Sequence, residues 1–274
     1  MTDDWTTALA RMIETLETPD FARNLAAGLR GIVDYDYTVI FGYVGPARPL
    51  ALFNDFPEDR RILHVDEYLE GPYLLDPFFL ASTGDVEPGL WRLSEIAPDR
   101  FYQGEYYRSY YGQTGLAEEI GLLVPVDSRL TVVISLMRKQ KRFSSAEVRA
   151  LKRIWPVLRA TVQANWKGFA QEDEAPGQPT RAERIEEAFH CIGQGVLTPR
   201  EREVVELTLR GHSAEATGNE LGISPGTVRI HRRNIYVKLR IGSQGELFTL
   251  FINAILSAPD TTARPADAGL LPPR

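Results

Sequence analysis

The segment ISPGTVRIHRRNIYVKL, residues 223–239, gathers cationic side chains in a chain whose formal net charge is −6. It contains three arginines, one lysine and no acidic residue. On a helix, Arg229 and Arg233 fall on one face, opposite apolar residues that can enter a core. Arginine can donate two hydrogen bonds to guanine in the DNA major groove, and lysine can neutralise a phosphate. The segment therefore indicates a DNA-reading helix, with a solvated charged face as the alternative.

A second group of residues, between 64 and 111, combines many aromatic rings with acids and a histidine. A cavity walled by such rings excludes water, and a carboxylate inside it, such as Asp76, would need a donor or a cation. That need favours a ligand bearing an N–H or an ammonium group, with cation–π support from the rings. The alternative is that the rings are ordinary core and that Asp76 caps a helix beginning at Pro77.

Two further features bear on such a cavity. Four tyrosines between residues 106 and 111 would occupy two faces of a helix, so at most half of them could point inward. Glu118 and Glu119 begin a strand candidate, and alternation along a strand places one of them inside. We assign Glu118 to the cavity.

Helix start and stop signals make the basic segment the third of four short helices. Thr198 with Glu201 three residues later forms a capping box, and Gly211 ends that first helix. After a second helix, Ser224 caps the third, and a fourth begins at Ser243. Two helices joined by a three-residue turn that contains glycine form a helix-turn-helix.

The preceding part of the chain has a mixed pattern. Helices are predicted at 5–17 and 20–31, strands at 35–44, 49–54, 118–126 and 130–138, and a long helix from Ser144 with Glu147 in its first turn. This order predicts the fold class α+β/α with two domains: an N-terminal α-β-α sandwich with an antiparallel sheet, then an all-α four-helix domain. The long helix, 144–165, is a candidate dimer surface, or it packs on the sheet.

The C-terminal motifs resemble a known family. The run LTPREREV from Leu197, the glycine at 211, ISPGTVRIH from Ile223 and the Lys-Leu pair at 238–239 are similar to the DNA-binding domain of LuxR-type transcriptional regulators. The resemblance implies that some side chains of the third helix face base edges (Arg229, Ile230, Arg233) and that others contact or order the phosphate backbone (Thr227, His231, Lys238). The expected DNA-binding set is Ser224, Thr227, Arg229, Ile230, His231, Arg232, Arg233 and Lys238.

The aromatic middle carries a second resemblance. His64-x3-Tyr68, Asp76-Pro77 and Trp91 are similar to the pocket pattern of acyl-homoserine-lactone receptors, whose sensor domain is GAF/PAS-like. In that family the aspartate accepts the amide proton of the ligand, which makes a quorum-sensing receptor the alternative to an amine sensor. The expected ligand-binding set is His64, Tyr68, Tyr73, Asp76, Phe78, Trp91 and Glu118.

Composition narrows the remaining classes. The single cysteine, Cys191, forms no internal disulfide, and no run of eighteen apolar residues or signal-peptide pattern occurs, so a cytoplasmic protein without membrane contact is expected. The four histidines are scattered and no phosphate-binding loop is present, so we expect no catalytic residues, no metal, no cofactor and no enzyme. A two-component receiver is excluded because its series of acids and a late lysine is missing.

The predicted function is a ligand-responsive, DNA-binding transcriptional regulator. A homodimer on a two-fold-related operator in double-stranded DNA is expected, and a small amine- or amide-bearing metabolite is the expected ligand. A ligand-independent regulator or a protein-interaction adaptor is the further alternative. The expected domains are a ligand-sensing and dimerisation domain (1–167), a linker (168–180), the DNA-binding domain (181–257) and a disordered tail (258–274).

Overall fold

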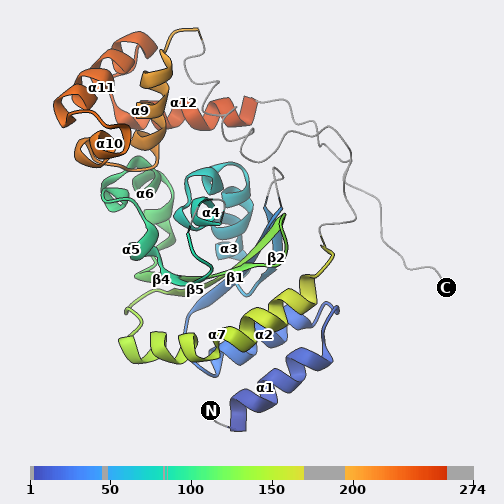
Figure 1. Cartoon of the computed structure of the whole chain (residues 1–274). Coiled ribbons are helices and arrows are strands. Elements are labelled where there is room, and N and C mark those ends of the chain that lie inside the picture. Colours follow the sequence, from blue (N-terminus) through green and yellow to red (C-terminus); the bar gives the residue numbers. More distant parts are fainter. Residues whose placement is uncertain (1–2, 45–48, 83, 85, 170–194, 258–274) are drawn as a thin grey trace.

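The computed structural model describes residues 3–44, 49–82, 84, 86–169 and 195–257. Its centre is an antiparallel sheet with the strand order β2-β1-β5-β4-β3 (Figure 1). The four strands expected from the sequence are confirmed, and the short edge strand β3 was not predicted. The strands are β1 (Tyr37–Val44), β2 (Leu50–Asn54), β3 (Gly89–Arg92), β4 (Glu118–Pro125) and β5 (Leu130–Arg138).

Three helices cover one face of the sheet: α1 (Asp3–Glu14), α2 (Phe21–Arg30) and α7 (Ser145–Trp166) (Figure 1). The predicted start of α7 is confirmed, because the Ser144 hydroxyl accepts a hydrogen bond from the Glu147 N–H. The apolar residues Leu151, Leu158 and Val162 of α7 are buried in the core on this side. These residues of α7 therefore pack on the sheet, as the second of the two alternatives predicts.

Short helical segments cover the other face. They are α3 (Glu58–Arg61), a π-helical turn (Ile62–Glu67), a 3-10 turn (Pro72–Leu75), α4 (Pro77–Ala81), α5 (Leu93–Ile96), a 3-10 turn (Phe101–Gln103), α6 (Glu105–Ser109) and a 3-10 turn (Tyr111–Thr114). Strand alternation divides the sheet residues between the two cores. Val39 and Phe41 of β1 face the short helices, whereas Ile40 faces the long ones.

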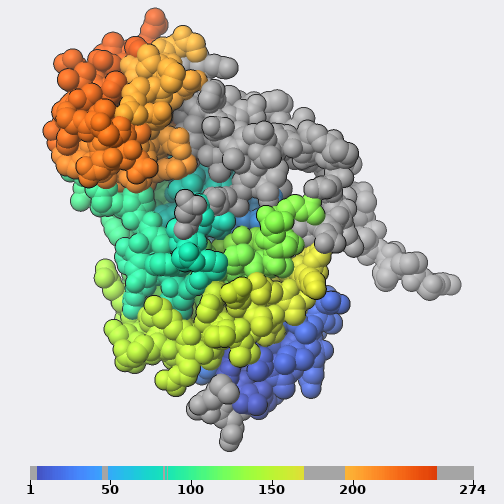
Figure 2. Space-filling model, viewed as in Figure 1, coloured from blue at the N-terminus to red at the C-terminus, as the bar shows by residue number. Residues whose placement is uncertain are grey.

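The C-terminal domain consists of α9 (Pro199–Leu209), α10 (Ala214–Leu221), α11 (Pro225–Leu239) and α12 (Gln244–Ser257). The predicted caps are confirmed: Thr198 and Glu201 form a capping box, and the Ser224 hydroxyl accepts from the Thr227 N–H. This domain packs on the short-helix side of the N-terminal domain (Figure 2). The expected tail, and the expected linker apart from residues 168 and 169, lie outside the described residues. In the described part of the chain, no helix is long and apolar enough to cross a membrane.

A buried arginine joins β5 to α7. The Arg138 side chain is 2% exposed, and its Nη2 lies 2.5 Å from Glu147 Oε1. Arg138 also donates to the Asp34 carbonyl and stacks on the Phe143 ring. The hydrogen bond from Arg138 lowers the pKa of Glu147 from 4.5 to about 2.

We expect Glu147→Gln to lower the free energy of unfolding by about 3 kcal/mol, because it leaves a buried guanidinium without its counter-charge. Since the folded-state pKa of Glu147 is depressed, its contribution is present above the ordinary carboxyl pKa and is lost as the pH falls from 4.5 towards 2. Urea unfolding across this pH range measures both effects. Ser144→Ala, which removes the helix cap and one hydrogen bond to Glu147 but keeps the ion pair with Arg138, is the control, with a loss of about 1 kcal/mol. Equal losses in both variants would contradict this role of the ion pair.

Candidate functional site

A cavity of about 30 Å³ lies between the sheet and the short helices. It brings together His64, Tyr68 and Asp76, three of the residues expected to bind a ligand. The sheet contributes Glu119 and Ser135 to the same cavity. The carboxyl, hydroxyl and imidazole groups thus come from segments far apart in the sequence.

Asp76 both caps a helix and faces the cavity. Its Oδ1 accepts from the Phe78 N–H at 3.0 Å, which caps α4 as the simpler sequence interpretation predicts. Its Oδ2 accepts from the Tyr68 hydroxyl at 2.6 Å, and that hydroxyl lies 2.9 Å from the Tyr43 hydroxyl. The two alternatives for Asp76 are therefore compatible.

Glu119, rather than the assigned Glu118, is the second carboxylate at the cavity. Glu119 is 6% exposed, and its Oε2 accepts from the Tyr111 hydroxyl at 2.9 Å. Glu118 points to the opposite side of β4, where it pairs with Arg92 and accepts from the Phe143 N–H. The alternation predicted one inward glutamate, and the assignment of Glu118 was off by one residue.

Both cavity carboxyls resist ionisation. Burial raises the pKa of Asp76, against the opposing hydrogen bonds from Tyr68 and the Phe78 N–H. Burial raises the pKa of Glu119 as well, and the nearby charge of Asp76 raises it further. No lysine or arginine is among the described residues that line the cavity. Two buried carboxyls that face one cavity can accept hydrogen bonds from a donor or, when ionised, pair with a cation.

His64 adds a neutral hydrogen-bonding group. Its side chain is 5% exposed and stacks on the Phe56 ring, with centroids 4.3 Å apart. Burial lowers the pKa of His64 to about 4, and the charge of Arg60 acts in the same direction. The imidazole is therefore neutral at pH 7, and its buried Nε2 has no hydrogen-bond partner within the described ranges. A polar atom in this state is suited to a bound ligand.

Three of the four clustered tyrosines line the cavity: Tyr106, Tyr110 and Tyr111. The prediction that at most half could point inward was wrong, because the chain does not continue as one helix. α6 ends at Ser109, Tyr110 takes φ −133° and ψ −73°, and a 3-10 turn begins at Tyr111. This change of direction rotates Tyr111 towards Glu119. No propensity or spacing in this segment indicates the break.

Three other expected ligand-binding residues lie outside the cavity lining. The Tyr73 ring packs on Phe79 at 5.1 Å, behind Tyr68. Phe78 lies against the backbone of Gly121, where a side chain on β4 would collide with its ring. Trp91, on β3, donates its indole N–H to the Glu87 carbonyl at 2.8 Å. These rings support the elements that carry Asp76 and the sheet edge.

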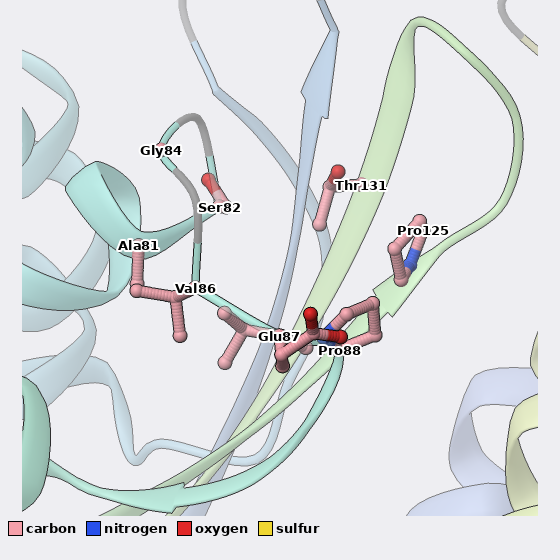
Figure 3. Close-up of a pocket in the computed structure, with 9 residues that line it drawn as sticks. Ala81, Ser82, Gly84, Val86, Glu87, Pro88, Pro125 and Thr131 are labelled. Atoms are coloured by element: carbon pink, nitrogen blue, oxygen red, sulfur yellow. The ribbon is translucent and has the colours of Figure 1, made fainter.

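A wider hollow of about 430 Å³ lies between residues 81, 82, 84 and 86–88 and the adjoining ends of β4 and β5 (Figure 3). Among its described lining residues there is no aromatic ring, and the carboxylate there, Glu87, is exposed. It therefore provides no buried group that needs a partner. The enclosed cavity is the candidate ligand site.

The C-terminal domain presents α11 to solvent. Val228 and Ile235 enter its core, as the helical spacing predicts. Arg229 and Arg233 are exposed, and Ile230 between them is 52% exposed. An exposed apolar residue flanked by arginines on a helix fits a major groove, where it can contact a thymine methyl group.

The other expected DNA-binding residues are arranged differently. Arg232 turns inward, where its Nε donates to the Thr208 hydroxyl at 3.0 Å and its Nη2 donates to the His212 carbonyl at 2.8 Å. The sequence placed Arg232 on the outer face beside Arg229 and Arg233, and this was wrong. Arg232 instead holds the turn between α9 and α10. Lys238 Nζ lies 2.7 Å from Glu201 Oε2, which ties α11 to α9.

The start of α11 is held by side chains as well as by its helical hydrogen bonds. The Ser224 and Thr227 hydroxyls lie 2.8 Å apart, and Ser224 is exposed. His231 is half-buried. Ile230 and Arg233 are therefore open for base contacts, and Arg229, also exposed, pairs with Glu215 at 2.5 Å.

Comparison with known proteins agrees with this architecture. Residues 195–251 match the family described as bacterial regulatory proteins, luxR family. The chain is 37% identical over 190 residues to an Aeromonas salmonicida protein that is named as an HTH-type transcriptional regulator and lies in the exeN 3′ region, covering 67% of this chain and 96% of that protein. It is 24% identical to the monoamine regulon transcriptional regulator of Klebsiella aerogenes, over 66% of this chain and 69% of that one.

The N-terminal domain has a solved structural neighbour. It is similar to the VqsR LBD domain of Pseudomonas aeruginosa, with a TM-score of 0.53 and 27% identity, covering 60% of this chain and 96% of that one. The Aeromonas relative, which this chain covers almost completely, and the match of the C-terminal helices point to one family. The chain therefore belongs to the luxR family of bacterial regulatory proteins and is a transcriptional regulator, not an enzyme.

Proposed function

We propose that this regulator responds to a small cationic amine bound in the N-terminal cavity. The observation that carries the proposal is the pair of buried carboxyls, Asp76 and Glu119, facing one cavity whose described lining holds no cation. An ammonium group has only donors, so it would donate hydrogen bonds to both carboxylates. The surrounding tyrosine rings would add cation–π contacts.

An acyl-homoserine lactone is the second candidate, because the Tyr68 and Asp76 pattern resembles that of its receptors. A neutral lactone could donate its amide proton to Asp76. It would leave the second cavity carboxyl, Glu119, without a ligand donor, although the apolar side chains of Val39, Leu116 and Met137 could contact its acyl chain. The second carboxyl favours the amine. The name of the Klebsiella relative, a regulator of a monoamine regulon, supports the same class.

On DNA, we propose a homodimer on a two-fold-related operator in double-stranded DNA. One helix-turn-helix contacts few base pairs, so two copies with half-sites about one helical turn apart supply the specificity. Arg229, Ile230 and Arg233 are the proposed base-contacting residues of each copy. Sedimentation of the whole chain with a selected operator tests this, and a complex with one chain per operator would contradict it.

Amine binding should strengthen as the pH rises. Burial raises the pKa of Asp76 and of Glu119, so both carboxyls take up protons above the ordinary carboxyl range. Without ligand, the two carboxyls stabilise the folded state fully at a pH below the pKa that they have in the unfolded chain. This contribution is lost as the pH rises through the higher pKa values that they have in the folded state. Ionisation over the same range creates the charge that an ammonium needs, so thermal stabilisation by 2-phenylethylamine should grow between about pH 5 and about pH 8.

An acyl-homoserine lactone measured in parallel separates the two ligand classes. A neutral ligand gains no counter-charge as the carboxyls ionise, so its stabilisation should stay level or decline with pH. Stabilisation by lactones alone, or amine stabilisation that is independent of pH, would contradict the amine assignment.

A further inference from the structure

A second cavity, of about 180 Å³, lies between the C-terminal domain and the segment that leads into α6. Its described lining residues include three arginines, Arg100, Arg108 and Arg232, and no acidic side chain. They come from the residue before a 3-10 turn, from α6 and from α11. Three positive charges that face one space repel one another unless an anion lies among them. The lining therefore indicates an anion-binding site.

Backbone contacts hold the two sides of this second cavity against each other. The Arg100 N–H donates to the Gly211 carbonyl at 3.1 Å. Gly211 has φ +93°, a conformation that favours glycine, and a Cβ there would lie 3.2 Å from the Phe101 Cα. The bare backbone of the turn between α9 and α10 thus lies directly on residues 100 and 101. The arginines extend from a backbone whose spacing is fixed, which prepares them for a ligand of defined size.

Arg232 is half-buried, whereas Arg100 and Arg108 are exposed. The Arg232 Nε donates to the Thr208 hydroxyl and its Nη2 to the His212 carbonyl, and both acceptors are neutral. Burial lowers the pKa of Arg232, and the charge of Arg100 acts in the same direction. In the described part of the chain, no carboxylate forms an ion pair with this guanidinium. A half-buried cation of this kind gains from a ligand that carries negative charge.

Two acidic residues adjoin the lining in sequence, and each has another hydrogen-bond partner. Asp99 accepts from the Ser213 N–H at 3.0 Å, and Glu105 Oε1 accepts from the Ser109 hydroxyl at 3.1 Å. Glu105 Oε2 lies 4.0 Å from Arg108 Nη1, at the outer limit of an ion pair, and such surface pairs contribute little. The two acids offset part of the positive charge from outside the lining. The guanidinium groups therefore remain able to bind a ligand.

Neutral donors complete the lining. They are the side-chain amides of Gln103 and Gln244 and the imidazole of His212. Gln244 Nε2 donates to the Thr208 carbonyl at 3.1 Å, which leaves its second N–H for a ligand. Burial lowers the pKa of His212, so the imidazole is neutral at pH 7 and carries one N–H. Donors from several side chains around one space match a ligand with several acceptor oxygens.

A phosphoryl group fits these donors better than a carboxylate does. A phosphate ester carries a charge of about −1.5 to −2 at pH 7 and three strong acceptor oxygens, whereas a carboxylate carries a single charge on two oxygens. Arginine binds a phosphate through two parallel N–H···O bonds. The cavity has the volume of about six water molecules, which is room for a phosphate or a diphosphate.

We propose that this second cavity binds a small phosphorylated anion, a diphosphate or a phosphate monoester, as a further ligand of the regulator. The site is separate from the amine cavity and does not depend on the function proposed above. Arg100 and Arg108 pair with the phosphoryl oxygens from the exposed side, and Arg232 donates from the buried side. The anion is a free one and not a phosphate of the DNA backbone, because residues 100–108 of the N-terminal domain form one side of the cavity.

Isothermal titration of the full chain with sodium pyrophosphate, at fixed ionic strength, tests the site. We expect saturable binding of one ion per chain, and Arg108→Gln should lower the affinity about tenfold or more. Arg100→Gln should repeat this loss. Arg153→Gln is the matched control, because Arg153 is exposed on α7, which covers the opposite face of the sheet (Figure 1). Equal losses in Arg108→Gln and Arg153→Gln, or no saturable binding to wild type, would overturn the proposal.

Two further measurements separate this site from DNA and from the amine cavity. In phosphate-free buffer, Arg108→Gln should bind unrelated DNA as wild type does. A lower DNA affinity of this variant would assign the cavity to a backbone phosphate and would overturn the proposal of a free anion. The Asp76→Asn, Glu119→Gln variant should bind pyrophosphate with wild-type affinity, and a loss of anion binding there would contradict a separate site.

Discussion

Replacing both cavity carboxyls, Asp76→Asn with Glu119→Gln, is expected to abolish the thermal stabilisation of the protein by cationic amines. The substitutions keep the shape of the site, remove its charge and replace one acceptor oxygen of each carboxyl by an amide donor. A buried ammonium that loses its counter-charge costs about 3–5 kcal/mol, which corresponds to a loss of affinity of roughly 10²-fold to 10³-fold or more. Isothermal titration with 2-phenylethylamine measures the loss.

The single variants should each lose a part of this affinity, and together more than their sum, because each carboxyl raises the cost of ionising the other. Glu118→Gln is the matched control. It changes the neighbouring carboxylate, which faces away from the cavity and pairs with Arg92. Its stability should fall while its amine affinity stays as in wild type. Amine affinity that survives in the double variant would return Asp76 to the role of a helix cap alone.

Arg233→Ala is expected to weaken binding to a selected operator by roughly 5-fold to 150-fold, the 1–3 kcal/mol of a bidentate contact to guanine. Binding to unrelated DNA should change little, so the ratio between the two affinities should collapse. Arg233 is the better choice for this test because the Arg229 guanidinium forms an ion pair with Glu215, at 2.5 Å. Binding isotherms over a range of salt concentrations separate base contacts from phosphate contacts.

Lys238→Ala provides the contrast. It should lower affinity for all DNA sequences alike, and the structure adds an effect on folding, because Glu201 is left without its cation at 5% side-chain exposure. Its unfolding curve must therefore be measured beside its DNA affinity. If Arg233→Ala and Lys238→Ala reduce binding to operator and to unrelated DNA equally, α11 does not read sequence through Arg233.

Local signals in the sequence predicted the starts of the C-terminal helices and of α7, and the long strands. Thr198, Ser224 and Ser144 mark helix starts, because their hydroxyls cap backbone N–H groups within three residues. The prediction failed where a choice depends on contacts from distant parts of the chain. Alternation requires one inward glutamate on β4, but the pairing with β5 decides that it is Glu119.

Two other differences have the same origin. The helix breaks at Tyr110, where the short helical segments close over the sheet. The Tyr110 hydroxyl donates there to the Leu63 carbonyl, 47 residues away. Arg232 leaves the outer face of α11 because Thr208 and the His212 carbonyl offer it acceptors in the neighbouring turn. Docking of the C-terminal domain on Phe101 also depends on a pairing of segments that no local pattern records.

The most direct test of the account is the operator affinity of the full chain with and without a saturating cationic amine. A DNA site selected from random sequences, labelled and titrated by fluorescence anisotropy, supplies the measurement. In wild type, we expect the amine to change operator affinity about tenfold or more, whereas the Asp76→Asn, Glu119→Gln variant should keep the amine-free affinity at every amine concentration. Operator affinity that stays the same in wild type while the amine is demonstrably bound would contradict the claim that this cavity controls DNA binding.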